Sequence, residues 1–279
     1  MFRIRNGCAD HCSLCRKSTT GKFICPVHDL DKILIRKDGK TAMIFGVVVA
    51  GGVGSRMNIS DMPKQFLPLG EKPIVIHTLE KFLLNQRFDI VYVGVHPDWM
   101  TYMQDLTRRF NLDGERLRLV PGGADRNLTI LNVIESIEKE FGAKDEHIIV
   151  THDAVRPFIT MRIIDDNIDA AIKYGACDTA VAATDTIVES EKGDFIKSIP
   201  DRRKMYQGQT PQSFKMELLK NLYTSLSEEE KSLLTDACKI CVFRSQPVYI
   251  VEGDVSNIKI TTVSDYKIAQ AMLGGIKLD

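Results

Sequence analysis

The chain has 279 residues, of which 44% are hydrophobic and 27% charged, a composition that fits a globular protein and excludes a disordered or fibrous one. Lys plus Arg equals Asp plus Glu at 37 each, so the net charge gives no general attraction to nucleic acid or to an anionic membrane. No apolar run reaches the roughly 20 residues needed to span a bilayer, and no apolar signal segment follows the N-terminus, so we expect a cytoplasmic protein without a membrane partner.

The first 42 residues differ in composition from the rest, and we place a domain boundary near Met43. Four of the seven cysteines crowd into this N-terminal extension. In a reducing cytosol such crowding suggests a metal site more than disulfides, and Zn²⁺ is the candidate ion. The possible ligands are Cys8, Cys12, Cys15, Cys25 and His28. A flexible tail with incidental cysteines is the alternative.

Residues 43–279 alternate short apolar runs with helical patterns. The predicted strands are Ile44–Ala50, Ile90–Val95, Leu117–Val120 and His147–His152, and the predicted helices are Ile74–Leu84, Met100–Phe110, Thr129–Phe141 and Ile163–Tyr174. Strand followed by helix, four times, predicts an α/β fold with a doubly wound, mostly parallel sheet.

The pattern changes after Asp178. A β-rich stretch, Thr179–Val188, is followed by a turn at 191–194 and a second stretch, Phe195–Ile199, which together predict a projecting β-hairpin arm. Two capping boxes predict further helices, because a hydroxyl and a carboxylate three residues apart satisfy the free backbone donors of a helix start. These boxes are Ser227 with Glu230 and Thr262 with Asp265.

A glycine-rich loop follows the first strand and carries Ala50, Gly51, Gly52, Gly54 and Arg56. Ligands of open α/β sheets bind beyond the carboxyl ends of the strands, where glycines let backbone N–H groups approach phosphate oxygens. The loop matches neither the dinucleotide fingerprint nor the Walker loop. It predicts a phosphate-binding loop, although an ordinary tight turn with solvated cations is the alternative.

Two cations lie eight residues apart on this segment, Arg56 and Lys64. In nucleotidyl transfer, negative charge grows around the α-phosphorus, and fixed cations stabilise that state more than the ground state. Arg56 can bind two phosphate oxygens at once, while Lys64 acts as a point charge. Both are therefore catalytic candidates.

Five motifs in order make the sequence from about Met43 onward resemble the cytidylyltransferases of 2-C-methyl-D-erythritol 4-phosphate and ribitol 5-phosphate. They are AGGVGSRM with PKQF (50–57, 63–66), GGADRN (122–127), THDAVRP (151–157), QTPQSF (209–214) and NIKITT (257–262). The resemblance implies a Rossmann-like nucleotidyltransferase fold, CTP and a small alditol phosphate as substrates, Mg²⁺ as cofactor, and a homodimer. The arm near 179–205 would reach into the partner subunit.

The same resemblance assigns roles by position. Ala50, Gly51, Gly52 and Gly54 would contact the nucleotide, as would Gly122, Gly123 and Thr129, whose glycines precede a helix start as at an anion site. The catalytic group would be Arg56, Lys64 and Lys259, and the acceptor-binding group Arg156 and Thr210. Asp153, at the carboxyl end of a strand, would meet Mg²⁺ held by substrate phosphates. For Asp153 a helix cap paired with Arg156 is the alternative, and for Lys259 a solvated surface lysine.

The acceptor is inferred from two departures and from three stretches, 155–158, 206–209 and 234–239, that look closer to ribitol-phosphate enzymes. The methylerythritol branch usually has Asp before the Asn of its last motif, where this chain has Ser256, and basic residues where this chain has Ile187–Glu189. These positions favour D-ribitol 5-phosphate, giving CDP-ribitol for wall or capsule polymers such as teichoic acid. The methylerythritol acceptor, used for isoprenoid precursors, is the main alternative. A sugar-1-phosphate nucleotidyltransferase and a non-catalytic nucleotide- or nucleic-acid-binding protein with an N-terminal zinc site also remain open.

Overall fold

A computed structural model describes residues 16–17, 23–24, 42–52 and 62–274. The chain divides into two units, Met1–Ala42 and Met43–Asp279, and each is described by itself. In the first unit, β1 (Arg16–Lys17) pairs antiparallel with β2 (Phe23–Ile24). The five candidate zinc ligands, Cys8, Cys12, Cys15, Cys25 and His28, lie outside the described residues.

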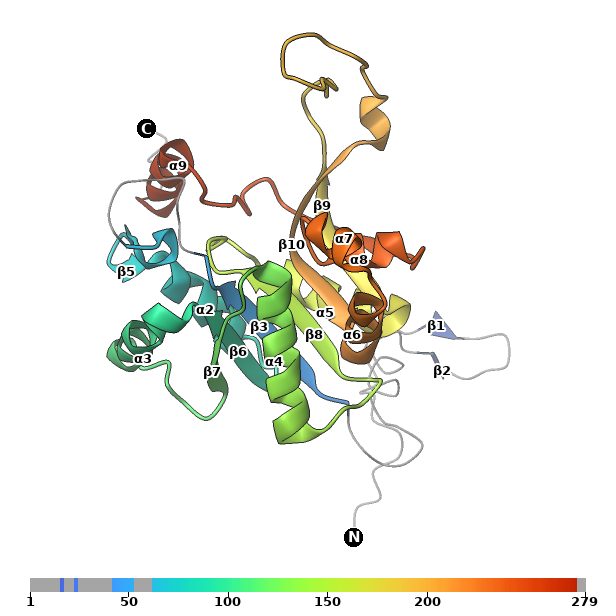
Figure 1. The fold of residues 1–279 in the computed structure, drawn as a ribbon. Coiled ribbons are helices and arrows are strands. Elements are labelled where there is room, and N and C mark those ends of the chain that lie inside the picture. Colours follow the sequence, from blue (N-terminus) through green and yellow to red (C-terminus); the bar gives the residue numbers. More distant parts are fainter. Residues whose placement is uncertain (1–15, 18–22, 25–41, 53–61, 275–279) are drawn as a thin grey trace. The chain divides into compact units, whose positions relative to one another are not determined.

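The second unit is built on a seven-stranded sheet of order β11-β9-β10-β8-β3-β6-β7 (Figure 1). The strands are β3 (Ile44–Ala50), β6 (Ile90–Val95), β7 (Leu117–Pro121), β8 (Ile148–Asp153), β9 (Ala176–Ala182), β10 (Tyr206–Lys215) and β11 (Tyr249–Glu252). Only β10 runs against the other six. The predicted doubly wound, mostly parallel α/β fold is confirmed.

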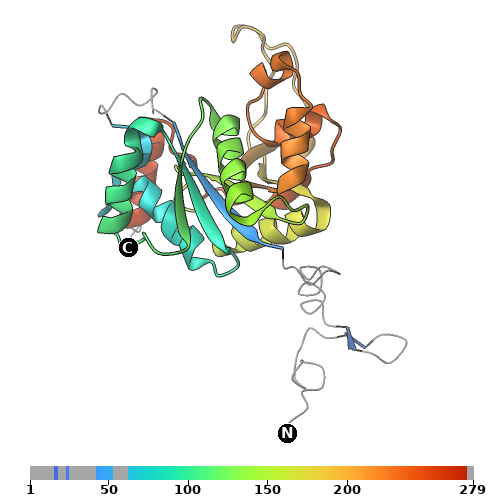
Figure 2. The same cartoon turned by 60° about the horizontal axis from the view of Figure 1, so that its bottom comes forward.

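Helices cover both faces of this sheet (Figure 2). On one face lie α2 (Ile74–Leu84), α3 (Met100–Arg109) and α5 (Met161–Tyr174), and on the other α4 (Arg126–Phe141), α6 (Met216–Thr224) and α8 (Cys238–Phe243). The short α7 (Glu228–Ser232) precedes α8. In α5, the buried residues Ile163, Ile164, Asn167, Ile168 and Ala171 recur every three or four positions, which is why this segment is an amphipathic helix.

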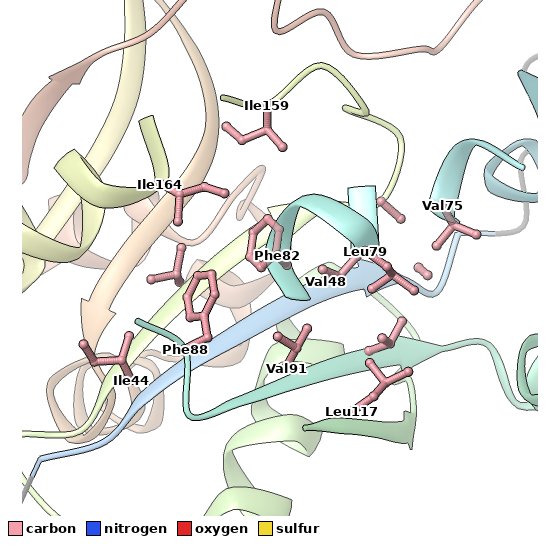
Figure 3. Close-up of a cluster of buried hydrophobic side chains, with 14 of the residues drawn as sticks. Ile44, Val48, Val75, Leu79, Phe82, Phe88, Val91, Leu117, Ile159 and Ile164 are labelled. Carbon is pink, nitrogen blue, oxygen red and sulfur yellow. The ribbon is translucent and has the colours of Figure 1, made fainter. Parts of the chain in front are cut away.

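The central strands are apolar on both faces because helices cover both. Along β3, Val48 packs with Phe82 and Val91 in one cluster (Figure 3), while its neighbour Val47 packs in the cluster on the opposite face. Phe82 stacks on Phe88 with ring centroids 5.1 Å apart. This two-sided core fixes the strand order and therefore which loops meet at the carboxyl ends of the strands.

The C-terminal helix α9 (Val263–Gly274) packs near a small hairpin of β4 (Pro68–Leu69) and β5 (Lys72–Pro73). Both predicted capping boxes are confirmed, since the backbone N–H and side chain of each hydroxyl residue bond reciprocally with Glu230 and Asp265. No helix in the described part of the chain is long and apolar enough to cross a membrane.

The segment between β9 and β10 projects away from the sheet (Figure 1). In place of the predicted pair of strands, the described arm has an isolated antiparallel bridge that joins Glu189 to Ser198. The turn η3 (Arg202–Lys204) then leads back to β10. Four large apolar side chains of this arm are exposed, Val188 by 49%, Phe195 by 82%, Ile196 by 61% and Ile199 by 61%. Such exposure is unusual for a part of a chain that functions alone.

Candidate active site

Asp153 ends β8 and is the centre of a charged cluster. Its Oδ2 lies 2.8 Å from Lys259 Nζ and 3.6 Å from Arg156 Nε, and its Oδ1 accepts a hydrogen bond of 3.2 Å from Arg126 Nε. The carboxylate is buried, with 8% of its side chain exposed. Three cations therefore surround one buried carboxylate, which leaves positive charge for an anionic ligand.

The ionisation of Asp153 follows from these neighbours. Burial by itself raises the pKa of a carboxyl group, but Arg126, Lys259 and Arg156 together hold the pKa of Asp153 well below its usual range. The group is therefore a carboxylate at neutral pH. An ionised carboxylate at the carboxyl end of a parallel strand can bind a metal ion held by substrate phosphates.

A hydrogen-bond network fixes the backbone around Asp153. The Thr210 hydroxyl accepts from the Asp153 backbone N–H at 3.2 Å and lies 2.9 Å from His152 Nδ1, while His152 Nε2 lies 3.1 Å from the Arg156 carbonyl. Burial lowers the pKa of His152 to about 4, so the ring is neutral and donates from Nε2 to the carbonyl oxygen of Arg156. Nδ1 is then the acceptor for the Thr210 hydroxyl.

The last predicted motif joins the same network through Asn257. Arg156 Nη1 donates to the Asn257 carbonyl at 2.7 Å, and Asn257 Nδ2 donates to the Thr210 carbonyl at 2.9 Å. Lys259 follows two residues later and is more exposed than its partner, with 41% of its side chain accessible. The segments that carry Asp153, Thr210 and Lys259 thus meet in space, although they lie far apart in the sequence.

The glycines of the nucleotide candidates meet around Thr129. An added Cβ would lie 3.2 Å from the Thr129 hydroxyl at Gly51 and 3.1 Å from it at Gly122, so both glycines pack tightly against Thr129. The Thr129 hydroxyl accepts from the Gly123 backbone N–H at 3.0 Å and donates to the Asp125 carbonyl at 2.8 Å. In this structure the Thr129 hydroxyl therefore fixes the backbone of the loop that precedes α4, and its side chain packs next to Gly51.

The start of the phosphate-binding loop is held by Gln65, whose Nε2 donates to the carbonyls of Ala50 and Gly52 at 2.9 and 2.8 Å. Gly52 is exposed and has nothing within 4 Å of an added Cβ, so its backbone is open to a ligand. Lys64 begins the turn η1 (Lys64–Phe66) and is partly buried. Gly54 and Arg56 lie outside the described residues.

Sequence reasoning did not single out Arg126, although it lies within the GGADRN motif. Its side chain is 19% exposed and it begins α4. Within the described part of the chain, its Nη1 and Nη2 have no hydrogen-bond partner, although solvent does not reach them. The signal available in the sequence was a basic residue at a predicted helix start, a few positions after two glycines. His152, Gln65 and Asn257 were missed as well, because their role is to position backbone.

Mg²⁺ fits this site only as an ion shared with a substrate. Within residues 42–52 and 62–274, His, Cys, Asp and Glu nowhere gather in a group of three or more that could hold a metal. Mg²⁺ needs few protein ligands when substrate phosphates and water supply the rest, and the ionised Asp153 can be one. The predicted Zn²⁺ site gains no support, since its ligands are outside the described part of the chain.

The sheet, the glycine loops at its carboxyl edge and the cations around Asp153 are those of an α/β nucleotidyltransferase. A family model described as IspD, 2-C-methyl-D-erythritol 4-phosphate cytidylyltransferase, matches residues 44–275. The chain belongs to this family, and its members are CTP-dependent cytidylyltransferases that bind CTP and a sugar phosphate. Family members typically use a divalent metal.

Solved structures agree on the fold. The 4-diphosphocytidyl-2C-methyl-D-erythritol synthase of Anaerococcus prevotii is 24% identical, with a TM-score of 0.69 over 84% of this chain and 99% of that one. The 2-C-methyl-D-erythritol 4-phosphate cytidylyltransferases of Thermus thermophilus and Francisella tularensis are also 24% identical, with TM-scores of 0.65 and 0.68. They cover 84% and 82% of this chain, and each is itself covered completely, at 100%.

These comparisons bear on the acceptor expected from the sequence. The preference for the ribitol 5-phosphate branch, with CDP-ribitol and teichoic acid as its products, gains no support from them, since the family and the three structures carry the methylerythritol name. The alternative acceptor is better supported. The departures at Ser256 and Ile187–Glu189 that led to the ribitol prediction therefore do not by themselves define a branch.

Proposed function

We propose that this protein transfers CMP from CTP to the phosphate of 2-C-methyl-D-erythritol 4-phosphate and releases pyrophosphate. The observation that carries the proposal is the cluster of Arg126, Arg156 and Lys259 around the buried carboxylate of Asp153, beside the glycines that end β3 and follow β7. Such an excess of buried positive charge suits two phosphorylated substrates that meet at one point. Family membership supports CTP as the donor.

In the proposed reaction, a phosphate oxygen of the acceptor attacks the α-phosphorus of CTP. The bond between the α-phosphorus and the bridging oxygen breaks, and that oxygen leaves with its electron pair as part of pyrophosphate. The attacking phosphate is already anionic at neutral pH, so no general base is required. The protein therefore acts by positioning the two substrates and neutralising their charge.

Roles follow from position. The backbone of Ala50, Gly51, Gly52 and Gly54, with that of Gly122 and Gly123, holds the nucleotide. Lys259 lies at the accessible side of the cluster and binds the acceptor phosphate. Arg156 and Thr210 form the surface of the acceptor site behind that phosphate. Arg56 and Lys64 stabilise the charge at the α-phosphorus. Asp153 would hold Mg²⁺ together with the triphosphate, and the ion would supply further charge neutralisation.

D-Ribitol 5-phosphate is the second candidate acceptor. It is favoured by Ser256, which stands where the methylerythritol pattern has Asp. The Ser256 backbone N–H donates to the carboxylate of Asp254 at 2.7 Å, so the acidic residue of this loop lies two positions earlier than in that pattern. The test is to incubate the purified protein with CTP, Mg²⁺ and each acceptor and to measure pyrophosphate release. If only ribitol 5-phosphate supports pyrophosphate release, it replaces 2-C-methyl-D-erythritol 4-phosphate as the proposed acceptor. If neither acceptor supports pyrophosphate release, the proposed CMP transfer is rejected.

We also propose that the arm near 179–205 joins two copies of the chain into a homodimer. Its exposed Phe195, Ile196 and Ile199 have the apolar character of an interface core. Phe195→Asp together with Ile199→Asp should lower the sedimenting mass to that of a monomer. The control is Val255→Asp, which changes a residue that is 73% exposed on a different loop. A monomeric wild-type protein would refute the proposal.

A further inference from the structure

Asp178 is a carboxylate for which the roles proposed above give no purpose. It lies on β9 directly opposite Gln212 of β10, and Gln212 in turn lies opposite Thr151 of β8. Partners across strands point to the same face of a sheet, as do residues two positions apart along a strand. Asp178 therefore shares its face with Asp153, and this is the face covered by α4.

Several polar atoms near this face are shielded from solvent and have no hydrogen-bond partner among the described residues. Oδ1 of Asp178 has no hydrogen-bond partner, and neither have Nη1 and Nη2 of Arg126. Asn127, which is 7% exposed and follows Arg126 in the first turn of α4, also has an unpaired Oδ1. A buried polar atom without a partner costs about 1–3 kcal/mol, so several of them beside one active site indicate a missing polar ligand.

Asp178 itself is held by few neighbours. Burial raises the pKa of Asp178 to about 7, and the side chain of Gln212, which hydrogen-bonds it, lowers that pKa only in part, as does the charge of Arg126. A Cβ added at Gly208 of β10 would lie 3.5 Å from Asp178 Oδ2, which is an ordinary contact distance. Oδ1 is left without a hydrogen-bond partner among the described residues.

The strand order shows which substrate lies nearer to Asp178. The glycine loops expected to hold the nucleotide follow β3 and β7, on one side of β8, whereas β10 and β9 lie on the other side. From strand spacing, two strands and two residues separate the Cα atoms of Asp178 and Asp153 by roughly 12 Å.

We propose that Asp178 is a specificity-determining residue of the acceptor subsite, where its unpaired oxygen accepts a hydrogen bond from a hydroxyl group of the acceptor. The proposal rests on the CMP-transfer function given above and deepens it. It identifies the acceptor class as an open-chain polyol phosphate with a free hydroxyl at the end away from the phosphate. The phosphate lies at Lys259, and the hydroxylated chain runs over β10 toward β9.

The first test measures steady-state kinetics by pyrophosphate release for Asp178→Ala, which has no side-chain acceptor, and for Asp178→Ser, whose hydroxyl is too short to reach the same point. We expect the KM of the acceptor to rise at least about tenfold in both variants, which is the loss of one hydrogen bond of about 1.4 kcal/mol, while the KM of CTP stays within twofold. Glu252→Gln is the matched control, because it removes an exposed carboxylate from the neighbouring strand β11. An unchanged acceptor KM, or an equal rise for CTP, overturns the proposal.

The second test separates a direct contact from a structural effect. Acceptors that lack one hydroxyl each are assayed with the wild type and with Asp178→Ala. The analogue without the contacted hydroxyl should lose activity with the wild type but little more with the variant, as in a double-mutant cycle. Additive losses for every analogue overturn the proposal. If the wild type binds CTP yet releases no pyrophosphate with any polyol phosphate, the proposed function fails instead.

Discussion

Lys259 Nζ lies 2.8 Å from Asp153 Oδ2, so the loop before α9 is joined to the end of β8 by an ion pair. The two side chains are unequally exposed, 41% for the lysine and 8% for the aspartate. The buried carboxylate of Asp153 therefore orients the Lys259 side chain, and the accessible ammonium group can meet the acceptor phosphate. An ion pair that is exposed on one side contributes little to stability, which points to a role in binding.

Replacing Lys259 should separate acceptor binding from folding. In Lys259→Met we expect kcat/KM for the acceptor to fall at least about tenfold, because a cation that meets the phosphate is lost while its apolar stem is kept. The melting temperature should stay within about 2 °C, since a partly exposed pair is weak. Lys267→Ala, which removes an exposed lysine from α9, is the control. Equal effects of both substitutions would contradict the role of Lys259.

Replacing Arg126 should lower the activity of the protein without lowering its stability. Three cations face Asp153, so removing one of them relieves repulsion and leaves the carboxylate paired. Arg126→Met should therefore melt at the same temperature as the wild type or a few degrees higher, while kcat/KM for CTP falls at least about tenfold. Calorimetry and pyrophosphate release measure the two effects.

The control for Arg126 is Arg118→Met, which breaks the exposed pair between Arg118 and Glu140 on β7 and α4. It should leave kcat/KM unchanged, because this pair lies away from Asp153. A marked loss of stability in Arg126→Met would show that Arg126 is a structural partner of Asp153, and activity close to that of the wild type would remove it from the site.

Much of the fold was predictable because the core strands obey local rules. The runs that became β3, β6, β7 and β8 are apolar, short and separated by helical patterns, as buried parallel strands require. The strand β10 escaped prediction, since it contains Gly208 and Pro211 where its pairing with β9 shifts register. Glycine and proline argue against a strand unless a bulge accommodates them.

The candidate site was predictable only in part. Asp153 and Lys259 were identifiable from motifs, and the structure brings them together. Arg126 and Asp178 were not, because their significance lies in unpaired atoms and in neighbours that are distant in sequence. Thr129 was expected to contact the nucleotide, and the structure adds that its hydroxyl bonds to the backbone of the same loop.

The packing of Thr129 against Gly94 can be tested with a second substitution that restores the stability lost in the first. An added Cβ at Gly94 would clash with Thr129 Cγ2, whereas Thr129 Cβ and the Thr129 carbonyl oxygen would lie 3.8 Å from it. Gly94→Ala should therefore lower the free energy of unfolding by about 1–3 kcal/mol. Adding Thr129→Ser removes the clashing methyl group, keeps the hydroxyl, and should restore most of the loss in chemical denaturation.

The control for this pair is Gly52→Ala, since an added Cβ there meets nothing within 4 Å. Its free energy of unfolding should match that of the wild type, while the KM of CTP should rise if the Gly52 backbone approaches a phosphate. A failure of Thr129→Ser to rescue Gly94→Ala would mean that strand β6 itself does not tolerate alanine, and that the contact with Thr129 is not the cause.

Asp178 should make the stability of the protein depend on pH. Burial, with a further contribution from Asp236, raises the pKa of Asp178 to about 7 in the folded state, against 3.8 for an ordinary aspartate. A group whose pKa is higher in the folded state stabilises folding below the unfolded value, and this contribution is lost as pH rises toward 7. The wild type should therefore lose stability between about pH 4 and pH 7 through this group.

Asp178→Asn removes that dependence because its amide does not titrate. Denaturation at pH 5 and at pH 8 should show that the wild type loses about 1–3 kcal/mol more than the variant between the two conditions. The Glu252→Gln protein should follow the wild type, since it retains Asp178. Parallel pH profiles for all three proteins would mean that Asp178 is already ionised in the folded state at pH 5, and that its environment is wetter than its burial indicates.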